Sequence, residues 1–451
     1  MKSLFCLVLF ILGTPVNTTA QTPKQHYFDW TEMPFTKEEL AQRRTNLIHE
    51  LVKNEKTGVV LIPARDGFSY GETFRQLDDF YYFTGLELPN SLLVINLTNK
   101  NASIYTPKDD LRFSRPSRPN DFPGRPLLKD KEITHRSGLE LKNITDFSSF
   151  MDEQAQKKAT VFLNSGQSGD FTFASGDYID SPSPTQLLGR ALKEKNNVLT
   201  FENSYQAIAK LRMVKSAAEI ELLRKATEIN IKGIRTAAKS VQPGIDERYL
   251  EGILEGNYKV NGAQRLAFGS IIKSGPNSLW PWRILATHYD RRNRSMENGD
   301  LVIFDVGCEY GHYVSDVGRT FPVSGRFSEE QKAILNMEVG IADAIIDFIK
   351  PGIRFADIRD LTDRIIPKDA KKYMQVGLFF GHHLGLSTGD PYLPDAPLQA
   401  GMVFTVEPWY YNHDKGLSVF TEDVILVTDN GCEVLSKGLP RTPDDLESIM
   451  K

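Results

Sequence analysis

The chain has 451 residues, of which 40% are hydrophobic and 25% are charged, and its formal net charge is −4. This composition supports ordinary globular cores, and the length is sufficient for two or three domains. The slightly acidic balance argues against nucleic acid or an anionic membrane surface as a binding partner.

Residues 1–20 have the layout of a secretory signal peptide. Lys2 precedes an apolar run from Leu4 to Leu12, and small residues lead up to Ala20, after which we expect cleavage. A buried N-terminal helix and a membrane anchor are the weaker interpretations, because the apolar run is too short to span a bilayer as a helix. No later segment is apolar for long enough to cross a bilayer. We therefore expect a soluble mature protein that is secreted or periplasmic.

Residues 21–37 are expected to form a polar leader, and residues 38–203 to form an α/β domain. A basic amphipathic helix is predicted over residues 37–53, and a proline-rich loop over residues 115–126. Short aliphatic runs predict strands at residues 58–63, 91–96 and 161–164.

A second domain is predicted over residues 204–451. Residues 216–241 have helical apolar spacing and stop before a Pro-Gly pair. A capping box formed by Ser328 and Gln331 marks the start of another helix, which is expected to end near Ile349. Strands that carry acidic residues are expected at residues 301–307, 313–321, 402–408 and 418–428.

Four carboxylates stand within or beside these apolar strands, where an isolated charge would be costly. A two-residue turn at Tyr310-Gly311 would pair Asp305 with Asp316. Their Cβ atoms would then lie roughly 5 Å apart on one face. Two like charges so placed repel each other unless a cation lies between them.

The same arithmetic applies downstream, where a turn at Asp414-Lys415 would place Glu407 opposite Glu422. His382 stands in the sequence Gly-His-His-Leu-Gly, whose glycines would allow backbone and substrate to come close. A single such acid would ordinarily be an ion-paired or turn residue. Two facing pairs together with an imidazole indicate a site for two divalent metal ions.

Long segments of the chain resemble a known family. Residues 204–445 are similar to the pita-bread metallopeptidases, which include aminopeptidase P, proline dipeptidase and methionine aminopeptidase. The matching segments are ILATHYDRRNRSMENGDLVIFDVGCEYGHYVSDVGRTFPVSG, GHHLG, GMVFTVEP and TEDVILV. Residues 38–165 resemble the N-terminal domain of aminopeptidase P, most closely in FRQLDDFYYFTGLELPNSLLVI. The resemblance implies an α/β (α+β) protein, with an aminopeptidase-P-type N-terminal domain followed by a pita-bread catalytic domain.

The resemblance also implies a set of metal ligands. Asp305 and Asp316 match the first two ligands of the family, and Asp316 would bridge the two metals. His382 matches the histidine ligand. Glu407 and Glu422 match the two glutamate ligands, and Glu407 would also act as the acid–base group. The ions implied are two divalent metals, with Mn²⁺ preferred for its oxygen-rich ligands and Zn²⁺ or Co²⁺ as alternatives.

Three further residues match substrate-contacting positions of the family. His288, seventeen residues before Asp305, matches a histidine that contacts the substrate and assists catalysis. Tyr411 matches a tyrosine that lines the same pocket. His383 is the competing assignment for the histidine ligand, and it is also a candidate for substrate binding.

The chain departs from the family pattern at three positions around this set. Gly389 stands where a second histidine usually polarises the scissile carbonyl, and Phe420 stands where an arginine is common. Leu378 replaces another frequent histidine. Losing one hydrogen bond to the transition state typically costs about 2.7–4 kcal/mol. Either nearby groups such as His383 substitute, or activity is weak or redirected.

These inferences predict a secreted Xaa-Pro aminopeptidase that acts on peptides with proline at the second position, and we expect a homo-oligomer. The preference for proline comes from the resemblance and not from residue spacing. One alternative is a proline dipeptidase or a related hydrolase. The other is a metal-bound, non-catalytic binding protein of the same fold, which Gly389 and Phe420 would favour and the intact ligand set disfavours.

Overall fold

The structure is a computed structural model of the chain and describes residues 32–53, 57–67, 74–109, 127–167, 183–280, 293–374 and 381–451. The expected signal peptide, most of the leader and the proline-rich loop lie outside the described residues, as do His288 and Leu378. Within the described ranges, no helix combines the length and apolar character that crossing a membrane would require.

The N-terminal domain is built on a six-stranded sheet with the order β4-β3-β2-β1-β5-β6. The strands are β1 (Val59–Pro63), β2 (Leu92–Asn96), β3 (Asn101–Thr106), β4 (Glu140–Asn143), β5 (Thr160–Leu163) and β6 (Thr200–Asn203). β2 is antiparallel to both β1 and β3, whereas the pairs β3–β4, β1–β5 and β5–β6 are parallel. The three strands expected from the sequence are present. Because this sheet ends at Asn203, we retain 203/204 as the proposed domain boundary.

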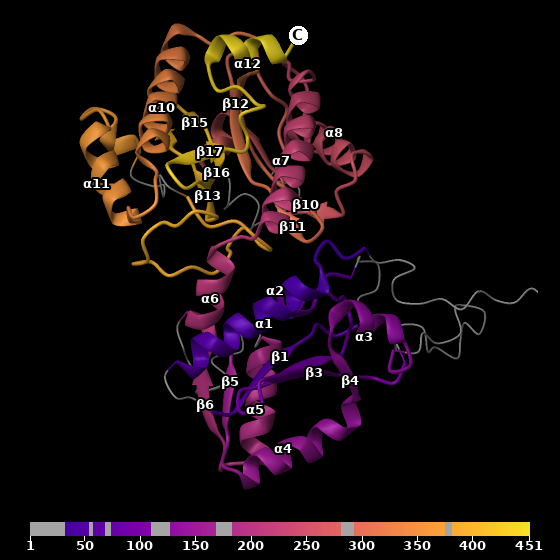
Figure 1. Cartoon of the computed structure of the whole chain (residues 1–451). Helices are drawn as coiled ribbons and strands as arrows, with labels where there is room; N and C mark the ends of the chain where they lie inside the picture. Colours follow the sequence, from indigo (N-terminus) through magenta and orange to yellow (C-terminus); the bar gives the residue numbers. More distant parts are fainter. Residues whose placement is uncertain are drawn as a thin grey trace, which may run out of the picture.

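Helices cover both faces of this sheet (Figure 1). They are α1 (Lys37–Val52), α2 (Asp78–Thr84), α3 (Lys131–Ser137), α4 (Phe147–Gln156) and α5 (Pro184–Lys195), with a 3₁₀ turn at Ile144–Asp146. Successive side chains of a strand point to opposite faces. Val60 and Ile62 therefore join the core that contains α1 and α2, whereas Val59 and Leu61 pack with α4 and α5. This layering confirms the expected α/β architecture.

The C-terminal domain surrounds short antiparallel sheets with helices (Figure 1). Its helices are α6 (Tyr205–Met213), α7 (Ala217–Ala238), α8 (Glu247–Val260), α10 (Glu329–Phe348), α11 (Phe355–Ile365) and α12 (Pro443–Ile449), with 3₁₀ segments at Gly275–Leu279 and Lys371–Tyr373. Capping boxes start α7 at Ser216 and α10 at Ser328. The second of these boxes was predicted from the sequence, and the two helices match the predicted spans.

Short strands line the interior of this domain. They are β7 (Arg265–Leu266), β8 (Ile271–Ser274), β9 (Leu301–Val306), β10 (Cys308–Tyr310), β11 (Tyr313–Val314), β12 (Val317–Pro322), β13 (Val403–Val406), β14 (Trp409–Asn412), β15 (Leu417–Phe420), β16 (Asp423–Val427) and β17 (Cys432–Val434). Two of the sheets have the orders β12-β9-β8 and β13-β16-β17. Each predicted acid-bearing strand is present. The one expected at residues 313–321 is divided into β11 and β12, and the one expected at residues 418–428 is divided into β15 and β16.

The predicted register of the first acidic hairpin was wrong. The turn falls at Gly311-His312, where both residues have positive φ, and not at the preceding pair. Such turns match the right-handed twist of hairpin strands, which explains why the backbone prefers them. As a result Asp305 pairs with Gly318, and Asp316 lies diagonally from Asp305 instead of directly opposite it.

The predicted register of the second acidic hairpin is confirmed. β14 and β15 pair Trp409 with Phe420, and β13 and β16 pair Val406 with Asp423. Both pairs have the register that places Glu407 opposite Glu422, with the turn between β14 and β15. The hairpin therefore brings these two acids to the same end of their sheets.

A buried ion-pair network joins the two domains at the end of α6. The Arg212 guanidinium lies 2.8 Å from an Asp79 oxygen and 3.2 Å from an Asp78 oxygen, both in α2, and it also binds Asp390 of the C-terminal domain. Lys215 Nζ lies 2.8 Å from Asp390 Oδ2. Burial alone would raise the pKa of Asp390, but Arg212 and Lys215 outweigh burial and hold that pKa below its ordinary value.

We expect Asp390→Asn to lower the melting temperature at neutral pH, because two buried cations lose their carboxylate. Breaking a buried pair typically costs about 3–5 kcal/mol. The folded-state pKa of Asp390 is depressed, so its stabilisation is present above the unfolded-state value of 3.8 and is lost as pH falls through the folded pKa. Thermal melts across this range should show the difference from wild type shrinking with acidity. A difference that persists or grows below the folded pKa would contradict the assignment.

Candidate metal centre

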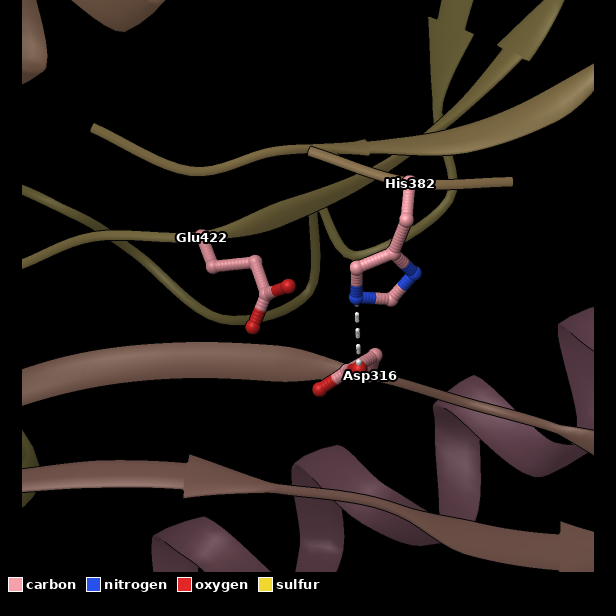
Figure 2. Close-up of side chains that lie close together, drawn as sticks. All are labelled: Asp316, His382 and Glu422. Carbon is pink, nitrogen blue, oxygen red and sulfur yellow. Dashed lines mark ion pairs between the residues drawn. The ribbon is translucent and has the colours of Figure 1, made fainter. Parts of the chain in front are cut away.

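Asp316, His382 and Glu422 come from separate parts of the C-terminal domain and lie together (Figure 2). Asp316 immediately precedes β12, Glu422 immediately precedes β16, and His382 lies in the segment before β13. One potential ligand atom from each of the three lies within 4.8 Å of the others. His382 Nε2 is 3.4 Å from Asp316 Oδ2.

Glu407 lies beside this cluster, between β13 and β14, and is held by one residue of each strand. Its Oε1 is 3.8 Å from His382 Nε2. The Thr405 hydroxyl donates to Glu407 Oε1 at 3.0 Å, and Trp409 Nε1 donates to Glu407 Oε2 at 3.3 Å. The sequence interpretation missed Thr405 and Trp409, although residues two positions apart on extended backbone share a face and could have indicated them.

Asp305 is the fifth residue of this group, and its carboxyl interacts with the charges of the other acids. It is only 6% exposed, and the carboxyls of Asp316 and Glu407 both act on its ionisation. All five residues expected to bind metal are therefore gathered in one region, in which Asp305, Asp316 and Glu422 are buried and the His382 side chain is 34% exposed. Their individual roles as ligands remain a prediction from the sequence.

Arg319 supports the strand that bears Glu422, and the sequence interpretation missed it. Its fully buried guanidinium donates to Glu422 O at 2.6 Å and to Asp423 Oδ1 at 2.7 Å. A buried arginine is stable only with such partners. The contacts link β12 to β16, so Arg319 fixes the backbone from which the Glu422 side chain projects. The sequence signal that could have indicated this role is an arginine within an otherwise apolar strand.

Burial and mutual repulsion shape the ionisation of the cluster. Burial, followed by the neighbouring carboxylates, raises the pKa of Asp305 and Glu422. Burial also raises the pKa of Asp316, and it raises that of Glu407 to about 7. For His382, burial would lower the pKa, but Asp316 and Glu407 raise it to about 9.

The donor atoms fit a divalent metal site. Asp316 Oδ1 and Glu422 Oε2 are buried and have no hydrogen-bond partner. Buried polar atoms normally have one, so these two oxygens require an explanation. Carboxylate oxygens and imidazole nitrogen are common ligands of Mn²⁺, Zn²⁺ and Co²⁺. The orphaned oxygens and the crowded negative charge would both be accommodated by bound cations.

The structure does not bring His383 to this cluster. Its ring is 1% exposed and stacks on Tyr392 at 5.4 Å, with the edges of Phe355 and Phe404 close by. Burial in this aromatic pocket is the first cause that lowers the pKa of His383 to about 3. The residue is a neutral packing group here, and its placement supports neither a ligand role nor a substrate contact.

Tyr411 lies at the edge of the cluster. Its hydroxyl is buried without a hydrogen-bond partner, and Asp305 and Glu407 both act on its ionisation. Burial, followed by these charges, raises the pKa of Tyr411, so the group is a neutral phenol. The pocket-lining role expected for Tyr411 stays a prediction from the sequence.

Phe420 forms an aromatic layer next to the cluster. Its ring stacks on Trp409 with a centroid separation of 3.6 Å, and Trp409 in turn contacts Glu407. A Cβ on Gly318 would come within 2.0 Å of the Phe420 ring, so the two positions are packed against each other. At this departure from the family pattern, the chain has replaced a charge with close apolar packing.

The glycines around the two histidines have specific steric causes. Gly381 has φ of +68°, and a Cβ there would meet Thr405 Oγ1 at 1.8 Å. A Cβ on Gly385 would meet Asp390 Oδ2 at 2.4 Å. Only glycine permits either approach. The motif therefore packs the His382 segment against β13 on one side and against Asp390 on the other.

Comparison with known proteins is consistent with this architecture. Residues 221–429 match the metallopeptidase family M24, and residues 40–162 match the aminopeptidase P N-terminal domain. The Xaa-Pro aminopeptidase of Escherichia coli (strain K12) is 25% identical over 450 residues, covering 92% of this chain and 98% of that enzyme. The Xaa-Pro dipeptidase of Pyrococcus furiosus is 34% identical over 252 residues, covering 54% of this chain and 69% of that enzyme.

The whole fold is also similar to a solved structure. Pseudomonas aeruginosa aminopeptidase PepP superimposes with a TM-score of 0.77 at 25% identity, covering 93% of this chain and 99% of that chain. The similarity extends over both domains in their observed order.

Asp316→Asn should reduce metal binding, because it removes the negative charge at the centre of the cluster. We expect a lower metal content per chain after loading with Mn²⁺ and removal of free ions, measured by elemental analysis. Asp360→Asn, at an exposed position of α11, is the control and should bind as wild type does. A folded Asp316→Asn protein with the wild-type metal content would contradict this prediction.

Proposed function

Because the chain belongs to the aminopeptidase P family of M24 metallopeptidases, we propose that it is a dinuclear Xaa-Pro aminopeptidase. Membership makes the protein a metal-dependent hydrolase with a dinuclear metal centre. The finer proposal concerns its substrate, which we take to be a peptide with proline at the second position. The metal is proposed to be Mn²⁺.

One observation carries this proposal above the others. Asp316, His382 and Glu422, which are distant in the sequence, place ligand atoms within 4.8 Å of one another, and Glu407 adjoins them. A non-catalytic binding protein would have no need to keep such a crowded and electrostatically costly group. The presence of the aminopeptidase P N-terminal domain supports the aminopeptidase in particular.

Asp305, Asp316, His382, Glu407 and Glu422 would hold the two ions. Bound divalent ions would lower the pKa of a water molecule and polarise the scissile carbonyl. Glu407 would take a proton from the attacking water and deliver it to the leaving nitrogen. Thr405 and Trp409 hold its two oxygens and so restrict its rotation. Proton delivery is essential for any peptide bond, since the leaving nitrogen departs as a neutral amine and not as an anion.

A proline dipeptidase is the second candidate. The identity to the Pyrococcus furiosus dipeptidase is 34%, which exceeds the 25% identity to the Escherichia coli aminopeptidase. That similarity covers only 54% of this chain, whereas the similarity to the aminopeptidase covers 92%. The two functions differ in the length of the substrate: a dipeptidase cleaves dipeptides, whereas an aminopeptidase P also cleaves longer peptides.

The decisive assay uses metal-loaded protein on Xaa-Pro dipeptides and on longer Xaa-Pro peptides, with Xaa-Ala peptides of equal length as controls. An aminopeptidase P should release the first residue from the longer Xaa-Pro peptides. Cleavage restricted to dipeptides would favour the dipeptidase. Equal cleavage of the Xaa-Ala series would refute the proline preference.

We also propose that the protein is exported, because its first 20 residues have a signal-peptide layout. Expression of the full chain in a secreting host should yield a mature protein whose N-terminus is Gln21. N-terminal sequencing of the exported fraction checks this, and an intact Met1 terminus retained in the cytosol would count against export.

Glu407→Gln should nearly abolish hydrolysis. The change weakens a ligand and removes the group that accepts the proton, while it keeps the size of the side chain. A loss of 100-fold or more in kcat is expected, on the order of other general acid–base deletions. A metal-loaded, folded variant with the wild-type turnover rate would refute the role of Glu407.

Gly389→His should raise kcat with little change in KM, if the histidine missing from the family pattern limits the transition state. The backbone permits this test. Gly389 is not among the residues with positive φ, and a Cβ there would meet nothing within 4 Å. The substitution should therefore leave the melting temperature close to that of wild type.

The control for this prediction is Gly385→Ala, which should destabilise the same segment because its Cβ would collide with Asp390. A stable Gly389→His protein with unchanged or lower kcat would show that no partner is missing. Since His383 is enclosed by aromatic rings, the substitute contact would then have to come from another group.

A further inference from the structure

The segment that carries His382 is held by β13 on one side. Thr405 N donates to His382 O at 3.0 Å, and Leu384 N donates to Val403 O at 3.0 Å. Beyond these bonds, residues 385–392 contain no helix or strand. We call residues 382–390 the His382 loop. Its remaining contacts must therefore determine how well its far side is positioned.

Arg75 of the N-terminal domain reaches across the domain boundary to this loop. Its Nη2 donates to Leu386 O in the His382 loop. Its Nε donates to Glu309 Oε2 in β10 at 2.6 Å, and its Nη1 donates to Asp78 Oδ1 in α2 at 2.7 Å. A guanidinium can serve several acceptors in a fixed plane. Arg75 therefore ties α2, β10 and the loop together.

Asp390 secures the other backbone group of the same residue. Its Oδ1 accepts from Leu386 N at 3.2 Å, while its carboxylate also pairs with Arg212 and Lys215. Arg212 extends from there to the acids of α2. Leu386 thus has its carbonyl fixed by Arg75 and its N–H fixed by Asp390, and both supports lead back to α2 of the N-terminal domain.

The Asp390 end of this connection is closely packed, whereas Arg75, Asp78, Arg212 and Ser387 line an open cavity of about 640 Å³. The Asp390 carboxylate lies so close to Gly385 that a Cβ there would approach within 2.4 Å. Arg212, Lys215 and Asp390 are each no more than 5% exposed. Leu386 is four residues from His382, so a displacement at Leu386 has a short path to the imidazole.

From these contacts we propose that Arg75 is a positioning residue for the metal centre, acting through Leu386 on His382. The N-terminal domain, through α2, thereby takes part in metal binding without supplying a ligand. This inference rests on the proposed metal-dependent function. Loss of groups that orient metal ligands typically lowers metal affinity by about 10–100-fold.

The test compares Arg75→Met with Arg44→Met. Arg44 is a buried arginine of the same domain, and its guanidinium donates to Phe83 O at 2.7 Å and to Ser137 O at 3.1 Å within that domain. Both variants remove a guanidinium, so a general loss of stability should appear in both melting temperatures. Only Arg75→Met removes the bond to the His382 loop.

Two measurements are made on full-length protein. Titration calorimetry with Mn²⁺ should show at least about a tenfold loss of affinity for Arg75→Met and a change within about twofold for Arg44→Met. Hydrogen exchange of the metal-free proteins should show faster exchange at the amides of Leu384 and Leu386 for Arg75→Met alone. Arg75→Lys retains the positive charge but lacks the planar set of guanidinium donors. Its Mn²⁺ affinity and loop exchange rates should therefore fall between those of wild type and Arg75→Met.

Wild-type Mn²⁺ affinity and unchanged loop exchange in folded Arg75→Met would overturn the inference, as would equal losses in both variants. If Arg75→Met does not fold, Arg75→Lys decides by the same two criteria. If the wild-type protein binds no divalent ion, the proposed function fails. The exchange measurement then still decides whether Arg75 positions the loop.

Discussion

Four carboxyl groups and one imidazole share a buried space in the C-terminal domain, and their charges must be balanced there. Burial and neighbouring carboxylates raise the pKa of Asp305 and Glu422, while the same neighbours raise that of His382. Removing like charges from water and placing them together is unfavourable without a cation. The hairpins, the tight glycine contacts and the supporting hydrogen bonds all serve to hold this group in place.

The supports come from well beyond the five side chains. Arg319 fixes the backbone of Glu422, and Thr405 contacts both Glu407 and the N–H of His382. Arg75 extends this support into the N-terminal domain. The N-terminal domain is therefore connected to the metal centre by a short path of partly buried hydrogen bonds. A metal site of this density depends on such partners for the orientation of its ligands.

Of the three departures from the family pattern, the two that lie within the described residues differ in physical character. Phe420 is packed between Trp409 and Gly318, so the loss of an arginine there is compensated by apolar contact. Gly389 leaves an exposed position with open space, and no neighbouring group fills it. The first change is part of the local packing. The glycine at position 389 leaves this side of the His382 loop without the side chain that the family usually has there. Its backbone is not strained.

The sequence by itself determined the α/β architecture, the main helices and strands, and the five residues of the cluster. It could do so because alternation, capping and motif spacing are local properties of the chain. It also determined the register of the Glu407–Glu422 hairpin, whose turn lies where the strand pattern places it. The tertiary structure decided what depends on distant partners. The turn of the first hairpin lies at Gly311-His312 because the backbone favours left-handed residues there. His383 packs away from the metal centre because aromatic rings from several elements surround it. The link from Arg75 to Leu386 spans 311 positions, and no local pattern encodes such a contact.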